Sequence, residues 1–593
     1  MRHIHKVVGW LLLPAILGLA ACSGREDEVD PQVAELLQMV PADTPYVLVS
    51  ARKHRFPRSR VEKMLAAQEM DVEVRKQGMD QAVAAWVNMG MLEEDTGESL
   101  RKLVHALIEE TEGKYSVEGW HSLGMEPRPR GLVYGLGAFP VLWQEVSDET
   151  KVENLIARVE ARSGVHAEQG RWKDVTYRRV GLASLSLIVA VHRGYLIMAL
   201  LPEKDETALL PGVLGERLPE KSLSPETFAA FAAERGFSGH AEGYVDVKRL
   251  LDAILAAGRQ GSLPGVVPES CSGFADELAR ALPLLSMGMT GVGEKRWTFA
   301  MNMETSPGVA AALKKIPAPV PGLGQESTAM LDIGMGVDFP ALRDGINSML
   351  RFFMRSGKDC ELVDEQALTQ AIQSVSMIMN PMLAGIHGFH LELDELKLNT
   401  EPPVLETLQG GLVVAAEQPA GLLGMLSSLA PELVRTPIPE DGTPVRLDLG
   451  DRVPVPGPVY AAIRGKALAV GLGEQARKKV ERLLALSPGM PPPMFAMSFD
   501  TRKVVPLMLF SVEQSLRLQE QALQSLEELA ALGDEDGELE EQIKVLKQNL
   551  ENARREKRNA ELSLKQMTLY RRSGVAIHAG DHGLEFHFTY DLD

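Results

Sequence analysis

Two distant stretches of this chain share the same order of features, and this self-similarity constrains the fold more than any single motif. Residues 190–200 and 461–471 each contain two apolar runs around an Arg-Gly pair, followed by a charged segment of helical type. Residues 243–249 and 497–503 then carry an apolar run to an aspartate that can cap a helix. The shared order predicts a tandem duplication with a period of roughly 250 to 285 residues. Ordinary alternation of strands and helices is the alternative explanation.

Each half closes with a predicted β-hairpin, at residues 288–303 and 574–590. Between the halves, residues 306–326 form the segment richest in proline and glycine, which is typical of a linker. The sequence therefore predicts an α+β fold in which helices cover antiparallel sheets. The first repeat would span residues 39–305 and the second residues 327–593.

The second half contains two segments with heptad spacing. Apolar residues recur at alternating steps of four and three over 509–530 and again over 539–567, and glycines flank the acidic break at 533–537. A short loop between two amphipathic helices of similar length predicts an antiparallel helical hairpin, a coiled coil over residues 509–567. Because no equivalent is evident in the first half, this hairpin is interpreted as an insertion.

The N-terminus contains Arg2 and Lys6, an apolar run over residues 7–21, and Leu19-Ala20-Ala21-Cys22. It resembles a bacterial lipoprotein signal peptide that ends in a lipobox. The run is too short for a comfortable membrane span, which needs about 20 apolar residues. The resemblance implies that residues 1–21 are removed, that Cys22 is lipidated with palmitate or a similar chain, and that residues 22–38 are a flexible stalk.

The location within the envelope follows from the next residue. In the lipoproteins that this segment resembles, an aspartate directly after the cysteine favours retention in the inner membrane. Ser23 stands there in this chain. The resemblance therefore implies the outer membrane, facing the periplasm, in preference to the inner membrane.

Composition indicates a large globular protein. The chain has 593 residues, of which 45% are hydrophobic and 24% charged, so more than one ordinary core is expected. The formal net charge of −19 disfavours nucleic acid and anionic lipid headgroups as partners of the surface as a whole.

Cysteine is scarce, since Cys271 and Cys360 are the two that remain besides Cys22. Each is expected in a loop between two helices, at corresponding positions of similar units. A disulfide between them would suit an oxidising compartment, and two separate buried thiols are the alternative.

No catalytic residue and no cofactor is predicted. Ser50 and Lys53 fit a Ser-x-x-Lys pattern, but the other elements of the penicillin-binding enzymes are missing. Paired histidines occur at 387 and 390, and three more at 578, 582 and 587. Two imidazoles without a carboxylate or thiolate make a weak site, so no metal is predicted. The 26 methionines suit core packing, and would also suit a pocket for a flexible apolar ligand.

Pro41-Ala42-Asp43-Thr44 resembles the opening motif of an uncharacterised group of internally duplicated bacterial envelope proteins. The resemblance supplies no catalytic residues. The leading hypothesis is a non-enzymatic interaction or scaffold role, in which the acidic hairpin tip contacts a basic surface of an envelope protein. That tip comprises Asp534, Glu535, Asp536 and Glu538. A carrier or chaperone for lipids or acyl chains is the alternative, and an envelope hydrolase is the third hypothesis.

Overall fold

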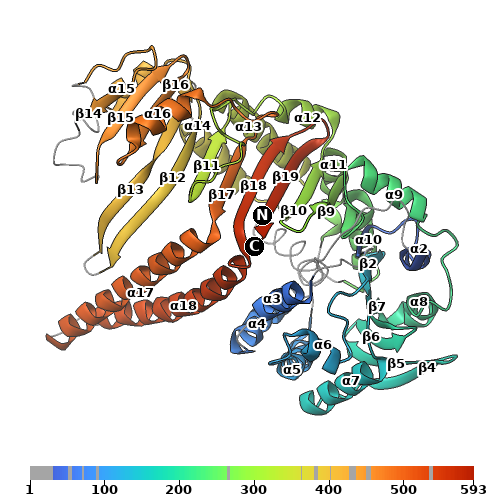
Figure 1. Ribbon diagram of the computed structural model, residues 1–593. Helices are drawn as coiled ribbons and strands as arrows, with labels where there is room; N and C mark the ends of the chain where they lie inside the picture. Colours follow the sequence, from blue (N-terminus) through green and yellow to red (C-terminus); the bar gives the residue numbers. More distant parts are fainter. Residues whose placement is uncertain are drawn as a thin grey trace.

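The computed structural model describes residues 31–50, 57–69, 72–88, 92–263, 267–361, 363–378, 385–400, 403–426, 436–448, 456–532 and 538–592. In these residues a mixed helix and sheet fold is built on one large antiparallel sheet (Figure 1). The predicted combination of helices with antiparallel strands is confirmed.

The strands of the first half are β1 (Tyr46–Ser50), β2 (Gly131–Leu136), β3 (Phe139–Glu145), β4 (Glu168–Trp172), β5 (Val175–Leu182), β6 (Leu185–His192), β7 (Tyr195–Pro202), β8 (Glu242–Asp246), β9 (Leu284–Val292) and β10 (Arg296–Glu304). Those of the second half are β11 (Leu331–Gly336), β12 (Ile386–Thr400), β13 (Pro403–Ala416), β14 (Val445–Leu447), β15 (Val459–Arg464), β16 (Ala467–Leu472), β17 (Phe495–Asp500), β18 (Tyr570–Ala579) and β19 (Gly583–Leu592).

The helices of the first half are α2 (Pro31–Leu37), α3 (Arg58–Gln68), α4 (Val72–Asn88), α5 (Glu94–Glu110), α6 (Val117–Ser122), α7 (Glu149–Ser163), η1 (Glu203–Asp205), α8 (Glu206–Val213), α9 (Pro225–Glu234), α10 (Val247–Arg259), η2 (Glu269–Cys271) and α11 (Ser272–Ala281). The remaining helices are α12 (Pro307–Leu313), α13 (Phe339–Ser356), α14 (Glu365–Ile378), α15 (Pro419–Leu426), α16 (Ala476–Ala485), α17 (Thr501–Leu532) and α18 (Glu538–Met567).

The strands of the two halves follow one another in a single sheet. Its spatial order is β4-β5-β6-β7-β3-β2-β1-β8-β9-β10 in the first half, continued by β19-β18-β17-β11-β12-β13-β16-β15-β14 in the second. Outward from the centre, each half places its strands in the same order of their position along the chain: the last three strands in reverse, then the first three, then one from the middle. These strands are β10-β9-β8-β1-β2-β3-β7 in the first half and β19-β18-β17-β11-β12-β13-β16 in the second. The junction between the halves is therefore a pairing of their last strands.

The helices also occupy matching places in the two halves. A helical pair, α10 and α11, separates β8 from β9, and another, α17 and α18, separates β17 from β18. The predicted hairpin thus has a counterpart in position, although each of its arms is more than twice as long. The interpretation of the hairpin as an insertion is not confirmed by this order. Its first helix also begins at Thr501, eight residues before the predicted start.

Helices pack on both faces of the sheet. On one face, Leu250 of α10 packs near Val245, and Val61 of α3 packs against Trp297 of β10. On the opposite face, Ala232 of α9 packs near Ala300 of β10, and Val480 of α16 packs against Val413. In Figure 1 the central strands β9, β10, β19, β18 and β17 lie side by side between these flanking layers. We call the face that carries α9 and α16 the upper face.

A disulfide joins the two halves. Cys271 precedes α11 and Cys360 follows α13, and their sulfur atoms are bonded at 2.02 Å. Both cysteines are buried, and Phe274 and Phe353 pack beside them with ring centres 5.7 Å apart. Of the two alternatives left by the sequence, the structure contains the bridge.

Two predicted boundaries are altered by packing. Residues 31–37, predicted within a flexible stalk, form α2, and Leu36 and Leu37 are buried in the first-half core because both are large and apolar. The predicted linker at 306–326 contains α12 and several buried apolar residues, among them Val320 and Leu323. The predicted signal segment, Cys22 and residues 23–30 lie outside the described residues. None of the helices in the described part combines the length and hydropathy needed to cross a membrane.

The disulfide should contribute measurably to stability, because it closes a loop of 89 residues in the unfolded chain. We expect the double variant Cys271→Ser/Cys360→Ser to lower the free energy of unfolding by about 2–5 kcal/mol, measured by urea unfolding without reductant. Adding reductant should destabilise the parent protein and leave the double variant unchanged. Equal stability of the two proteins without reductant would contradict this expectation.

Candidate functional site

The central strands carry different chemistry on their two faces. On the lower face, aromatic side chains of β10 and β19 form pairs, such as Phe299 with Phe588 at a ring-centre distance of 5.8 Å. On the upper face, Thr298 of β10 lies opposite Thr589 of β19, and Asn302 lies opposite Glu585. Because side chains alternate along a strand, one face can supply the core while the other displays polar groups. The upper face is therefore the one that presents polar side chains to a ligand.

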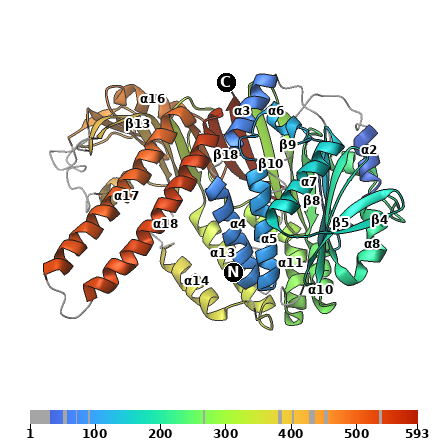
Figure 2. The same ribbon diagram turned by 90° about the horizontal axis from the view of Figure 1, so that it is seen from below.

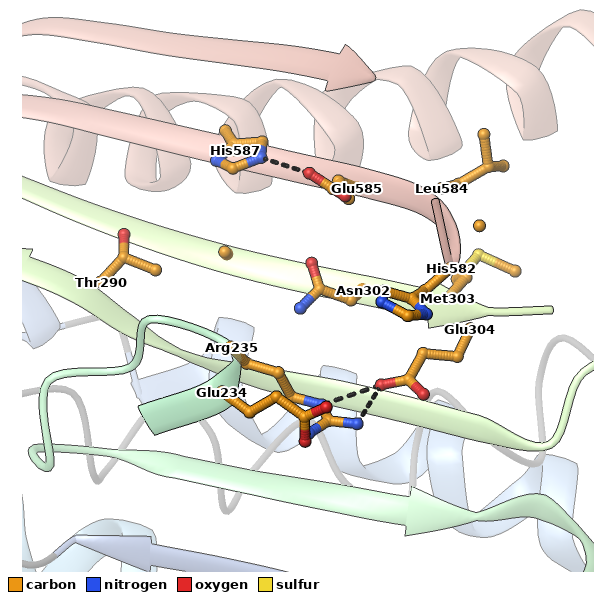
Figure 3. A pocket seen from close by; sticks show the side chains of 12 residues that line it. Glu234, Arg235, Thr290, Asn302, Met303, Glu304, His582, Leu584, Glu585 and His587 are labelled. Atoms are coloured by element: carbon orange, nitrogen blue, oxygen red, sulfur yellow. Dashed lines mark hydrogen bonds and ion pairs between the residues drawn. The ribbon is translucent and has the colours of Figure 1, made fainter. Parts of the chain in front are cut away.

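Two of the three C-terminal histidines share that face with a carboxylate. His578 of β18 lies directly opposite Glu585 of β19, and His587 is two residues further along β19. The Nε2 atom of His587 is 3.3 Å from Glu585 Oε2 (Figure 3). The rings of His578 and His587 stand nearly perpendicular, with centres 5.3 Å apart. The structure thus supplies the carboxylate that sequence reasoning found missing beside these imidazoles.

The histidines and the glutamate influence one another's ionisation. The hydrogen bond from His587 lowers the pKa of Glu585 below its ordinary value, and this outweighs the opposite effect of burial. Burial lowers the pKa of His578, and the neighbouring His587 adds to that effect. The Nδ1 atom of His578 is buried and has no hydrogen-bond partner among the described residues. Glu585 is therefore held ionised, while His578 is favoured in its neutral form.

Glu585 and His587 border a pocket of about 230 Å³ at the junction of the halves. Its lining includes His582, Glu585 and His587 from the second half, and Arg235 and Glu304 from the first (Figure 3). Arg235 donates from Nε and Nη2 to Glu304 Oε1 at 2.8 and 2.6 Å, and its guanidinium lies 4.3 Å from the Phe231 ring centre. Because the Arg235 guanidinium is paired with Glu304 and stacked on Phe231, it lines the pocket without offering a free positive charge.

The turn between β18 and β19 lies close to the Glu585 carboxylate. Gly580 lies in this turn, and a Cβ atom there would stand 1.9 Å from Glu585 Oε1. A larger residue at 580 would therefore displace the carboxylate from its present position.

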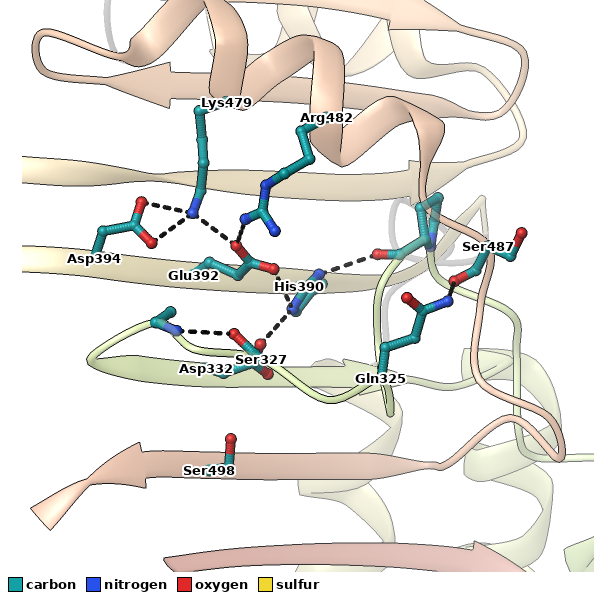
Figure 4. A network of polar contacts seen from close by, with 12 residues as sticks. Gln325, Ser327, Asp332, His390, Glu392, Asp394, Lys479, Arg482, Ser487 and Ser498 are labelled. Carbon is teal, nitrogen blue, oxygen red and sulfur yellow. Dashed lines mark hydrogen bonds and ion pairs between the residues drawn. The ribbon is translucent and has the colours of Figure 1, made fainter. Parts of the chain in front are cut away.

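A second polar cluster lies further along the same face, deep under α16 (Figure 4). Asp332 of β11 and His390 and Glu392 of β12 are all buried, with ligand atoms within 4.8 Å of one another. His390 Nε2 is 3.1 Å from Asp332 Oδ2, and His390 Nδ1 is 3.1 Å from the Pro321 carbonyl oxygen. Gly322 permits this approach, since it has φ +81° and a Cβ there would stand 2.6 Å from the His390 ring.

The second cluster is closed by its own charges. Lys479 Nζ donates to Glu392 Oε2 at 2.6 Å and to Asp394 at 2.6 and 2.8 Å, and Arg482 also contacts Glu392. Burial raises the pKa of Glu392, but Lys479 and Arg482 more than offset this and hold it below its ordinary value. Both ring nitrogens of His390 already face an oxygen atom of the protein, Asp332 Oδ2 and the Pro321 carbonyl oxygen. The arrangement is that of a structural ion network, not of a metal site.

The remaining predicted site residues are not brought together with either cluster. Cys271 and Cys360 form the disulfide described above. Cys22, Asp534, Glu535 and Asp536 lie outside the described residues, and of Glu538 only the backbone is described, at the start of α18.

Sequence reasoning missed Lys479 and Glu392, because they are 87 residues apart and meet only through strand order. One signal was present for the open site. Glu585 stands two residues before His587, and residues two apart on a strand share a face. Comparisons with protein-family models, with curated proteins and with solved structures find no match for this chain.

We expect Lys479→Met to destabilise the protein by about 3–5 kcal/mol, because it leaves Glu392 buried with one cation fewer. Lys479 is 7% exposed, whereas the Arg477 side chain on the same helix is 65% exposed. The matched control Arg477→Met should therefore change stability by less than about 1 kcal/mol. Urea unfolding at pH 7 measures both.

The same pair predicts a pH dependence. Since the pKa of Glu392 is lowered on folding, its ionised form stabilises the protein fully above the ordinary value of 4.5, and this contribution is lost as the pH falls below it. The stability difference between the parent and Lys479→Met should therefore shrink between pH 6 and pH 3. A difference that stays constant over this range would argue against the network.

Proposed function

We propose that this protein is a lipid-anchored envelope protein of the outer membrane, facing the periplasm, with a non-enzymatic interaction or scaffold role. The observation that carries the proposal is the helical hairpin of α17 and α18, which extends away from the sheet in both views (Figures 1 and 2). At 1.5 Å per residue its arms of 32 and 30 residues are about 45–48 Å long. An arm of this length offers a partner surface well separated from the body.

The two arms are matched to each other. The predicted seam positions, such as Leu516, Leu523 and Leu550, are half-buried or buried, while most described residues between them are exposed. Glu527 pairs with Lys547, and Glu520 with Arg554, each at 2.8 Å. Both pairs fit one antiparallel register, in which Leu529 lies level with Val545. The seam residues therefore face the other arm, and the ion pairs occupy one flank of the hairpin.

The other flank is exposed and uncharged. Side chains two positions apart on a helix point in directions that differ by about 200°. Leu529 is two positions from Glu527, and Val545 is two positions from Lys547, so both lie on the side of the hairpin away from the Glu527–Lys547 pair. Leu518, Leu529 and Val545 are 65%, 52% and 51% exposed. Exposed uncharged residues recur along α17 at steps of four and three, namely Ser511, Ser515, Leu518, Ala522, Ser525 and Leu529. This second heptad stripe supports docking of an amphipathic helix from a partner protein.

Two further observations support a periplasmic location and an origin by tandem duplication. The Cys271–Cys360 disulfide is typical of oxidising compartments such as the periplasm, in agreement with the N-terminal resemblance. The matching strand orders support a tandem duplication. On that basis the coiled-coil hairpin is a lengthened form of the α10–α11 pair.

The interaction is tested by photo-crosslinking from position 545 in cells. We expect a discrete adduct with one envelope protein, and expect Leu529→Lys to reduce it at least tenfold because a charge enters the uncharged stripe. The matched control Gln524→Lys, on the charged flank, should leave the adduct unchanged. Absence of an adduct, or equal effects of the two substitutions, would sink the scaffold proposal.

The hairpin can also be shortened without losing its register. Deleting residues 519–532 together with 538–551 removes two heptads from each arm. The body should retain its thermal unfolding temperature, and the adduct formed from a photo-crosslinker at position 518, which the deletion leaves in place, should disappear. A carrier role predicts instead that a bound amphiphile of a few hundred daltons is seen by native mass spectrometry and is released on denaturation, and that the shortened protein still carries it.

The anchor is tested through Cys22. We expect Cys22→Ala to abolish labelling by radioactive palmitate and to move the protein from the membrane to the soluble fraction, while Ser23→Ala retains both. Ser23→Asp should keep the label and shift the protein to the inner membrane. Labelling that survives in Cys22→Ala would refute lipidation at this residue.

A further inference from the structure

We propose that His578, Glu585 and His587 form a zinc-binding site on the upper face of the β18–β19 hairpin, facing the pocket at the junction of the two halves. Nitrogen ligands select zinc and its transition-metal neighbours over calcium and magnesium, which prefer oxygen alone. The proposal is independent of the interaction role of α17 and α18.

The spacing of Glu585 and His587 suits two ligands of one metal ion. Their facing atoms, Oε2 and Nε2, are 3.3 Å apart, which is long for a charge-assisted hydrogen bond of about 2.7–2.9 Å. With metal–ligand bonds of about 2.0–2.1 Å, two ligands on a tetrahedral zinc ion are separated by roughly 3.3 Å. Glu585 and His587 are therefore close enough for one ion to take the place of their hydrogen bond.

The two imidazoles are also spaced for a shared ion. Their ring centres are 5.3 Å apart at 88°. Two imidazoles bound to one tetrahedral zinc ion have their ring centres roughly 5 Å apart, given Zn–N bonds of about 2.0 Å. His578 Nδ1 is buried and without a hydrogen-bond partner in the described part of the chain. A metal ion would satisfy this otherwise costly atom.

The surroundings leave a fourth position open. His582 and Glu304 line the same pocket, which opens to solvent, so a water molecule or one of these side chains can complete the coordination (Figure 3). The His587 side chain is 45% exposed and can turn toward the ion. Such a turn is needed, because the ligand atoms of His578, Glu585 and His587 do not yet all lie within 4.8 Å of one another. Among the described residues Asp332, His390 and Glu392 meet that distance, and they already contact one another or the cations beside them.

The test uses the purified full-length protein and Zn²⁺ alone, with affinity measured by competition against a chromophoric chelator. We expect one zinc ion per chain. Loss of even an outer partner of a metal site costs about 10- to 100-fold in affinity, so His578→Gln, Glu585→Gln and His587→Gln should each weaken binding at least tenfold. Co²⁺ bound to the parent should give the visible absorption of a tetrahedral site, and each variant should lose it.

His166→Gln is the matched control, because His166 is exposed and distant in sequence from the cluster. It should bind zinc as the parent does. A thermal unfolding curve for each variant separates loss of ligand from loss of fold, and His587→Gln, which alters a half-exposed side chain, should remain folded. Absence of zinc binding by the parent, or binding that all three variants retain, would overturn the proposal. The proposal would also be overturned if His390→Gln lost zinc binding while the three variants kept it, because the ion would then lie at Asp332, His390 and Glu392.

Discussion

The backbone pairing of β10 with β19 is the interaction on which the rest of the structure depends. Nine residues of β10, from Arg296 to Glu304, are in register with β19, and this ladder turns two half-sheets into one. Arg296 donates to Asp591 at 2.6 Å at one end of the ladder, and Lys314, just after α12, contacts Asp581 near the other. Pairing also removes what would otherwise be two exposed strand edges, each a template for aggregation.

The same junction sets the chemistry of the two faces. Aromatic pairs below the central strands bury the apolar side against α3 and its neighbours. The polar residues of β10 and β19 are thereby left together on the upper face, where Glu585 and His587 line the pocket and His578 lies opposite Glu585. The network of Glu392 with Lys479 is covered by α16, so its charges neutralise each other internally. The Glu585–His587 pair is therefore accessible from the pocket, whereas the buried Glu392–Lys479 network is closed by its own charges.

Helical pairs follow β8, β11 and β17. The first two pairs approach each other and are bonded through Cys271 and Cys360. The third, α17 and α18, satisfies its apolar residues with an internal seam and so can leave the body. Its uncharged flank then remains available for another helix.

Local features of the fold could be read from the sequence because their causes are local. Asp246 accepts from the Arg249 backbone N–H at 2.9 Å as a predicted helix cap, and the hairpins at 288–303 and 574–590 and the seam of α17 and α18 follow from turn residues and spacing. The continuity of the sheet, the charge network and the position of Glu585 between histidines were decided by tertiary structure. Each depends on which strands become neighbours and in what register, and such long-range pairing is not encoded in any one segment.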